Sequence, residues 1–125
     1  MRYSPQREKV YEVLCNNPMH LSADEVLALS KQDMPEIGIA TVYRNLNALV
    51  EHGMVRRIKS VDGVDHYDAN TKSHPHFICT KCAKVFDSEI SYKDVLGSIQ
   101  KQCSDDVEDV EIFIKGLCKS CKLGA

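Results

Sequence analysis

The sequence contains no tryptophan, and aromatic residues make up only 6% of the chain. It has no apolar run near the roughly 20 residues that a membrane-spanning helix needs, and its N-terminus does not resemble a signal peptide. The net charge of −2 gives no general indication of nucleic-acid binding. With 43% hydrophobic and 27% charged residues, the composition is that of an ordinary soluble protein, and 125 residues hold one domain or two small ones. We therefore expect a cytoplasmic protein.

Arginine is absent from the second half of the chain. The five arginines all precede residue 60, at Arg2, Arg7, Arg44, Arg56 and Arg57. Because the guanidinium group suits bidentate contacts with phosphate and guanine, this distribution suggests that the N-terminal half faces DNA.

Helix-start signals divide the first half of the chain. Ser4 before Pro5 fits an N-cap followed by proline at the first helical position. The motif from Ser22 to Glu25 is a capping box, which opens a second helix through about Lys31. A third helix is predicted over residues 39–51.

The third helix has one apolar and one polar face. Its apolar residues recur at helical spacing and predict a buried stripe of Val42, Leu46, Leu49 and Val50. The outward face then carries Tyr43, Arg44 and Asn47. After Gly53, two short strand-like arms, 54–59 and 64–68, flank a turn that contains Gly63 and predict a hairpin. Three helices and a hairpin indicate a winged helix-turn-helix, and a generic small helical domain is the alternative.

The remaining sequence predicts a second small unit. A polar segment, residues 69–73, separates it as a hinge. Strands are expected over 76–80, 84–88 and 110–115, with a helix over 92–103. We thus expect an α+β protein: a winged-helix DNA-binding domain over residues 1–68, then an α/β dimerisation and metal-binding domain over 74–125. Its core is small, so a zinc site and a dimer interface would supply the missing stability.

Two Cys-x-x-Cys pairs provide four metal ligands in the second unit. These are Cys79 with Cys82 and Cys118 with Cys121. Four thiolates form the common closed structural Zn²⁺ site, and matched pairs are more specific than one pair. Two disulfides or a redox thiol pair are the alternatives. Cys15 and Cys103 lack such partners, and we interpret them as small hydrophobic residues on helical apolar faces or at their ends.

A second set of ligands precedes the first cysteine pair. His74 and His76 project to the same side of an extended segment because side chains alternate along a strand. Asp68 and Asp87 are the nearby carboxylates. A mixed imidazole and carboxylate set suits Fe²⁺, Mn²⁺ or Zn²⁺, although a His-x-His pair alone is more often a pair of surface histidines.

Five motifs in this order resemble the ferric uptake regulator family of metal-dependent repressors. They are Ser4-Pro-Gln-Arg7, Ala40-Thr-Val-Tyr-Arg-Asn-Leu46, Gly53-Met-Val55, His74-x-His76-x-x-Cys79-x-x-Cys82 and Cys118-x-x-Cys121. The resemblance covers essentially the whole chain. It implies an N-terminal winged helix that binds DNA, a C-terminal unit that forms a homodimer, and a regulatory metal between them.

The resemblance also implies the regulatory ligands His20, Asp68, His74, His76 and Asp87, for Fe²⁺ or Mn²⁺. Iron-uptake members usually carry glutamate at the position of Asp87, whereas the peroxide-sensing branch carries aspartate. The chain therefore resembles the peroxide-sensing branch, in which peroxide and bound Fe²⁺ oxidise a ligand histidine, here His20 or His74. Under Mn²⁺ the same site should repress with little response to peroxide.

The expected DNA contacts follow from the same resemblance and from the third helix. Tyr43 can contact a thymine methyl group, and Arg44 can reach phosphate or a base edge. Asn47 lies on the same outward face, and Arg56 in the wing is a candidate phosphate contact. Arg2 is expected in a minor groove of a palindromic operator, although the usual leader helix is missing before it. We interpret Arg57 equally as a phosphate contact and as a solvated charge.

Two further hypotheses compete with a peroxide-responsive repressor. The first is a repressor of the same family that senses iron, manganese or zinc levels. The second is a small zinc hydrolase with His74, His76 and a carboxylate around an activated water, although so short a chain offers no separate general base.

Overall fold

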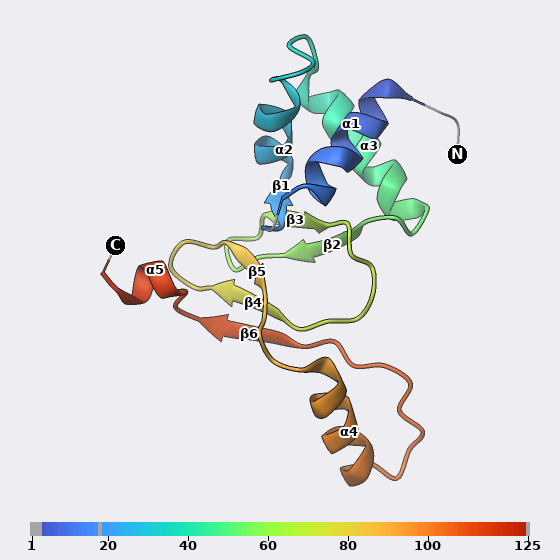
Figure 1. The fold of residues 1–125 in the computed structure, drawn as a ribbon, viewed down its shortest axis with the longest axis vertical. Helices are drawn as coiled ribbons and strands as arrows, with labels where there is room; N and C mark the ends of the chain where they lie inside the picture. The colour runs from blue at the N-terminus through green and yellow to red at the C-terminus, as the bar shows by residue number, and fades with distance from the viewer. Residues whose placement is uncertain (1–3, 18, 125) are drawn as a thin grey trace. The chain divides into compact units, whose positions relative to one another are not determined.

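The chain forms two units, Met1–Thr71 and Lys72–Ala125, each with its own three-stranded sheet. A computed structural model describes residues 4–17 and 19–124 (Figure 1). In that part of the chain, no helix is both long and apolar enough to span a membrane.

The helices of the first unit begin where their caps predict. Helix α1, Pro5–Cys15, starts after Ser4, whose hydroxyl accepts a hydrogen bond from the Arg7 amide at 3.3 Å. Helix α2, Ala23–Ser30, opens with the complete capping box of Ser22 and Glu25. Both caps satisfy amide groups that the first helical turn leaves without a partner, so they fix where each helix begins.

Helix α3, Ile39–Glu51, supplies most of the contact between the helices. Val42, Leu46 and Leu49 are buried, as predicted, whereas Val50 is only partly buried. Asn45 is also buried, and its Nδ2 donates to the Thr41 carbonyl at 2.9 Å. Its amide can lie in the apolar stripe because this bond satisfies one of its polar groups locally.

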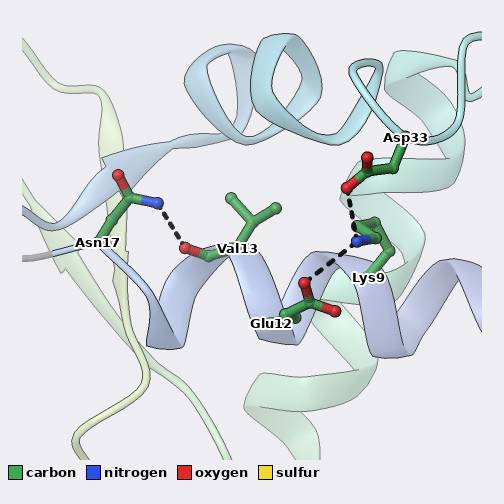
Figure 2. Close-up of polar contacts among 5 residues, drawn as sticks. All are labelled: Lys9, Glu12, Val13, Asn17 and Asp33. Atoms are coloured by element: carbon green, nitrogen blue, oxygen red, sulfur yellow. Dashed lines mark hydrogen bonds and ion pairs between the residues drawn. The ribbon is translucent and has the colours of Figure 1, made fainter.

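A salt bridge joins α1 to the loop after α2 (Figure 2). Lys9 Nζ lies 2.8 Å from Asp33 Oδ2 and 3.2 Å from Glu12 Oε1. Asp33 contributes most to raising the pKa of Lys9. At the end of α1, Asn17 Nδ2 donates to the Val13 carbonyl at 2.6 Å and satisfies a terminal carbonyl of the helix.

The sheet of the first unit has the strand order β1-β3-β2. The predicted hairpin is confirmed as β2, Arg56–Lys59, and β3, Asp65–Asp68, joined by a turn in which Gly63 has a φ of +82°. Strand β1, Leu21–Ser22, was not predicted from the sequence; it pairs antiparallel with β3. This short strand carries the chain from the segment containing His20 directly into α2.

The sheet of the second unit has the order β5-β4-β6. Strand β4, His76–Cys79, is central; β5, Val85–Asp87, pairs with it antiparallel, and β6, Phe113–Gly116, pairs with it parallel. Gly116 fits a close approach, because a Cβ there would lie 3.3 Å from the Phe77 ring. The predicted strand, 110–115, ended one residue before this glycine, and the observed β6 also begins later, at Phe113.

Two helices complete the second unit (Figure 1). Helix α4, Tyr92–Gln102, begins at the Ser91 cap and contains no buried residue; its apolar residues Val95, Leu96 and Ile99 are only partly buried. Short helix α5, Lys119–Lys122, was not predicted; Cys118 is its N-cap and Cys121 lies within it. Cys15 is the last residue of α1 and Cys103 is the C-cap of α4, so both lie at helix ends as predicted, but both are exposed and do not act as packed hydrophobic residues in a single chain.

Candidate metal centres and nucleic-acid interface

The structure brings the four paired cysteines together in the second unit. Their sulfur atoms all lie within 4.8 Å of one another, and Cys82 Sγ lies 3.9 Å from Cys118 Sγ. A tetrahedral Zn²⁺ with Zn–S bonds of about 2.3 Å separates its sulfurs by about 3.8 Å. The arrangement therefore fits a structural zinc ion, which would join the turn after β4 to α5.

Backbone amides already favour a thiolate in this cluster. The amides of Cys82 and Cys118 each donate to Cys79 Sγ at 3.4 Å and lower the pKa of Cys79 to about 5. The thiol of Cys118 and burial raise the pKa of Cys121 to about 12. Hence a second thiolate is unfavourable beside the first one without a cation, and Zn²⁺ supplies the positive charge that allows all four to ionise.

Ala83, directly after Cys82, has a left-handed backbone with a φ of 63°. This conformation costs a residue with a Cβ about 1–2 kcal/mol, and glycine adopts it freely. We expect Ala83→Gly to stabilise the zinc-loaded protein by about 1 kcal/mol, seen as a higher midpoint of thermal unfolding. Ala28→Gly on the exposed side of α2 should have the opposite effect. An equal loss of stability in both variants would contradict the strain at Ala83.

The first unit holds a buried histidine and aspartate pair. His20 Nε2 lies 3.5 Å from Asp68 Oδ2, and both side chains are more than nine-tenths buried. His20 directly precedes β1, and Asp68 ends β3, so the pairing of these strands positions the two residues. A second buried histidine supports them, because His66 Nδ1 lies 2.8 Å from the His20 carbonyl oxygen. His66 was not predicted from the sequence, because its contact with His20 depends on the unpredicted strand β1.

The second unit holds another such pair. His74 Nε2 lies 2.9 Å from Asp87 Oδ1, while His74 Nδ1 donates to the Lys72 carbonyl at 2.6 Å. The carbonyl bond occupies Nδ1, so Nε2 is the nitrogen that faces the carboxylate and can bind a cation. His76 lies opposite Asp87 in the sheet register, and its ring centroid is 4.3 Å from that of His74. Two imidazoles and a carboxylate thus converge within this unit.

The buried ring of His76 is held by packing. It stacks on Phe113 of β6, with 5.8 Å between ring centroids and an interplanar angle of 18°. Its exposed fraction is 1%. The sheet therefore fixes the orientation of this imidazole before any metal binds.

The outward residues of α3 lie on the surface of the first unit. Tyr43 is 46% exposed, and Arg44 is exposed with its Nη2 donating to Thr41 Oγ1 at 3.2 Å. Asn47 is exposed on the same helix, and Arg56 is half-buried on β2. Arg2, the remaining expected DNA contact, lies outside the described residues.

The chain matches known proteins over most of its length. The sequence profile described as the Ferric uptake regulator family matches residues 1–115. The peroxide-responsive repressor PerR of Staphylococcus epidermidis is 32% identical over 123 residues, which cover 98% of this chain and 82% of that protein.

Solved structures share the fold. The ferric uptake regulator Fur of Helicobacter pylori has a TM-score of 0.82 at 25% identity, covering 98% of this chain and 83% of that one. The peroxide stress regulator of Campylobacter jejuni has a TM-score of 0.74 at 32% identity, covering 94% of this chain and 89% of that one.

These matches decide between the classes of function that the metal ligands left open. Members of the matched family are transcription regulators that bind DNA and act as dimers, so the hypothesis of a zinc hydrolase is wrong. The family profile spans both units, including the first cysteine pair and all the histidines of the second unit. The chain belongs to the ferric uptake regulator family of metal-sensing, DNA-binding transcription regulators.

Proposed function

We propose that this chain is a metal-dependent repressor that responds to peroxide. His20 and Asp68 from the first unit and His74, His76 and Asp87 from the second would bind one Fe²⁺ or Mn²⁺ together. Two preformed histidine and aspartate pairs, one in each unit, support this proposal. Each pair places nitrogen and carboxylate ligands close together, and such a mixed set suits Fe²⁺ or Mn²⁺ better than the four thiolates do.

A metal that requires ligands from both units couples their arrangement to metal binding. The metal stabilises the arrangement of the two units in which all five ligands reach it. The size of this stabilisation is set by how much more tightly the metal binds that arrangement than any other. In a homodimer, that arrangement would set the spacing of two α3 helices on the half-sites of a palindromic operator. The half-exposed apolar residues Val95, Leu96 and Ile99 on α4 offer a surface for dimerisation. We place this regulator in the cytoplasm.

The peroxide response would act on the ligand histidines. Fe²⁺ held by these ligands would supply the electrons for reductive cleavage of peroxide beside the imidazoles. His20 and His74 are the proposed targets, and oxidation of either ring would weaken metal binding and release DNA. The 32% identity to a PerR and the aspartate at position 87 support this response over a simple response to metal level.

The proposed response predicts a specific chemical product. Protein loaded with Fe²⁺ and treated with a low concentration of peroxide should gain the mass of one oxygen atom on the peptide containing His20 or His74. Mass spectrometry of the digested protein measures it, with Mn²⁺-loaded protein as the control. Asp87→Glu, which keeps a carboxylate, should bind metal and oxidise more slowly.

The alternative within the family is a repressor that senses metal level alone. The structural similarity to the Helicobacter pylori ferric uptake regulator favours it as the second candidate. Two results together would support this alternative and contradict the peroxide response. The histidines of iron-loaded protein would gain no oxygen after peroxide treatment, and the protein would bind DNA only with metal.

A further inference from the structure

Arg57 links the wing of the first unit to helix α3. Its Nη2 donates to Asn47 Oδ1 at 2.7 Å, between residues ten positions apart in the sequence. A guanidinium group only donates hydrogen bonds, so the atom of the Asn47 amide that faces Arg57 must be its oxygen. The NH₂ group of Asn47 consequently points to the other side of the amide. The orientation of an exposed asparagine is therefore determined by a neighbouring residue.

Arg57 is itself restrained from two further directions. Its Nε lies 3.6 Å from Asp65 Oδ2, and its guanidinium carbon lies 5.8 Å from the centroid of the Tyr67 ring. Tyr67 is only 2% exposed, so this ring is a fixed surface for the arginine. Both partners belong to β3, next to the strand that carries Arg57. The wing thus holds the guanidinium group in place before DNA binds.

We propose that Arg57 is a positioning residue that fixes the hydrogen-bonding identity of Asn47 for base recognition. This inference depends on the proposed role of α3 in reading DNA. With its oxygen held by Arg57, Asn47 presents hydrogen-bond donors outward. Donors match the acceptor edges of the major groove, which are guanine N7 and O6, thymine O4 and adenine N7. They do not match the amino group of cytosine, so the recognised base at this position bears an acceptor.

The positioning role differs measurably from a phosphate contact. A phosphate contact strengthens binding to all sequences about equally. Its loss reduces the slope of log binding constant against log salt concentration by about one. Loss of the restraint on Asn47 instead lets the amide turn over and present either oxygen or nitrogen. Base preference then weakens at the one position in each half-site that Asn47 reads, while preferences elsewhere stay unchanged.

Arg57→Met and Lys59→Met form a matched pair of variants for this test. Each removes one positive charge from β2 and keeps an unbranched side chain. Lys59 is 69% exposed and also pairs with Asp65, at 3.4 Å, but it has no contact with Asn47 among the described interactions. A third variant, Asn47→Asp, keeps an oxygen for Arg57 and replaces the outward donor by an acceptor.

The full chain, loaded with Zn²⁺ and Mn²⁺, is used to select duplexes from a synthetic library of randomised DNA, which is then sequenced. Fluorescence anisotropy then measures affinity for the selected duplex and for single-base variants of it. We expect Arg57→Met to reduce discrimination at one position per half-site about fivefold or more. We expect Lys59→Met to leave every base preference intact. Asn47→Asp should shift the preference at the same position toward a base with an amino group.

Different results separate this inference from the proposed function. If Arg57→Met lowers affinity for all duplexes equally and leaves every base preference intact, Arg57 is a phosphate contact and the inference is overturned. An unchanged base preference in Asn47→Asp would overturn it as well. If the wild-type chain selects no sequence at all, the proposed function itself fails.

Discussion

Replacing Cys118 by serine should unfold the second unit while the first unit keeps its fold. Zn²⁺ binding to four thiolates contributes on the order of 10–16 kcal/mol in small zinc domains, whereas a whole domain is stable by only about 5–15 kcal/mol. Among the described residues of the second unit, only Ile78, Cys79 and Val85 are buried hydrophobic residues. Without zinc, so small a core cannot offset the loss of conformational entropy on folding.

Hydrogen exchange of each unit measures this effect. In Cys118→Ser the amides of β4, β5 and β6 should lose protection, while those of α1 and α3 keep it because their core is separate. Cys15→Ser and Cys103→Ser are the matched controls, since both remove an exposed thiol outside the cluster. These controls should retain one tightly bound zinc and normal protection. Retained protection of β6 in Cys118→Ser would contradict a structural role for the cluster.

Local signals explain which elements the sequence could predict. Ser4, Pro5 and the capping box at Ser22 act within one helical turn, and the predicted helix starts are correct because such caps depend on nearby residues alone. The grouping of the four cysteines was also predictable, because each pair lies within a single tight turn and tetrahedral zinc geometry then requires the two pairs to meet.

Interactions between distant residues explain what the sequence could not predict. Strand β1 contains only two residues and exists because Leu21 and Ser22 pair with Tyr67 and His66, far along the chain. The contact of His66 with the His20 carbonyl follows from that pairing, so neither was predictable. Arg57 likewise could be read equally as a solvated charge or a phosphate contact, because its bond to Asn47 depends on how the wing lies against α3.

Replacing His74 by alanine should abolish metal-dependent DNA binding with little effect on folding. Its Nε2 is the nitrogen that faces Asp87, and its ring is only partly buried, so the substitution removes a proposed metal ligand without opening a large cavity. His76 is a poorer choice because its buried ring also packs on Phe113. Coupling free energies between sites of about 1–3 kcal/mol correspond to roughly 5–150-fold in affinity. We expect Mn²⁺ to raise the affinity of wild-type protein for its selected duplex within this range, and to leave that of His74→Ala unchanged.

His52→Ala provides the matched control for this experiment. His52 is exposed at the C-terminal end of α3, its Nδ1 contacts the Ala48 carbonyl at 2.9 Å, and it belongs to neither of the two histidine and aspartate pairs. Fluorescence anisotropy with Mn²⁺ avoids oxidation, and zinc content together with circular dichroism confirms that both variants are folded. Since a ligand shifts an equilibrium only by its differential affinity for the two states, loss of one ligand should remove the metal response rather than DNA binding as such. His52→Ala should gain affinity for DNA with Mn²⁺, as the wild-type protein does. If His74→Ala gains affinity too, the regulatory metal binds elsewhere.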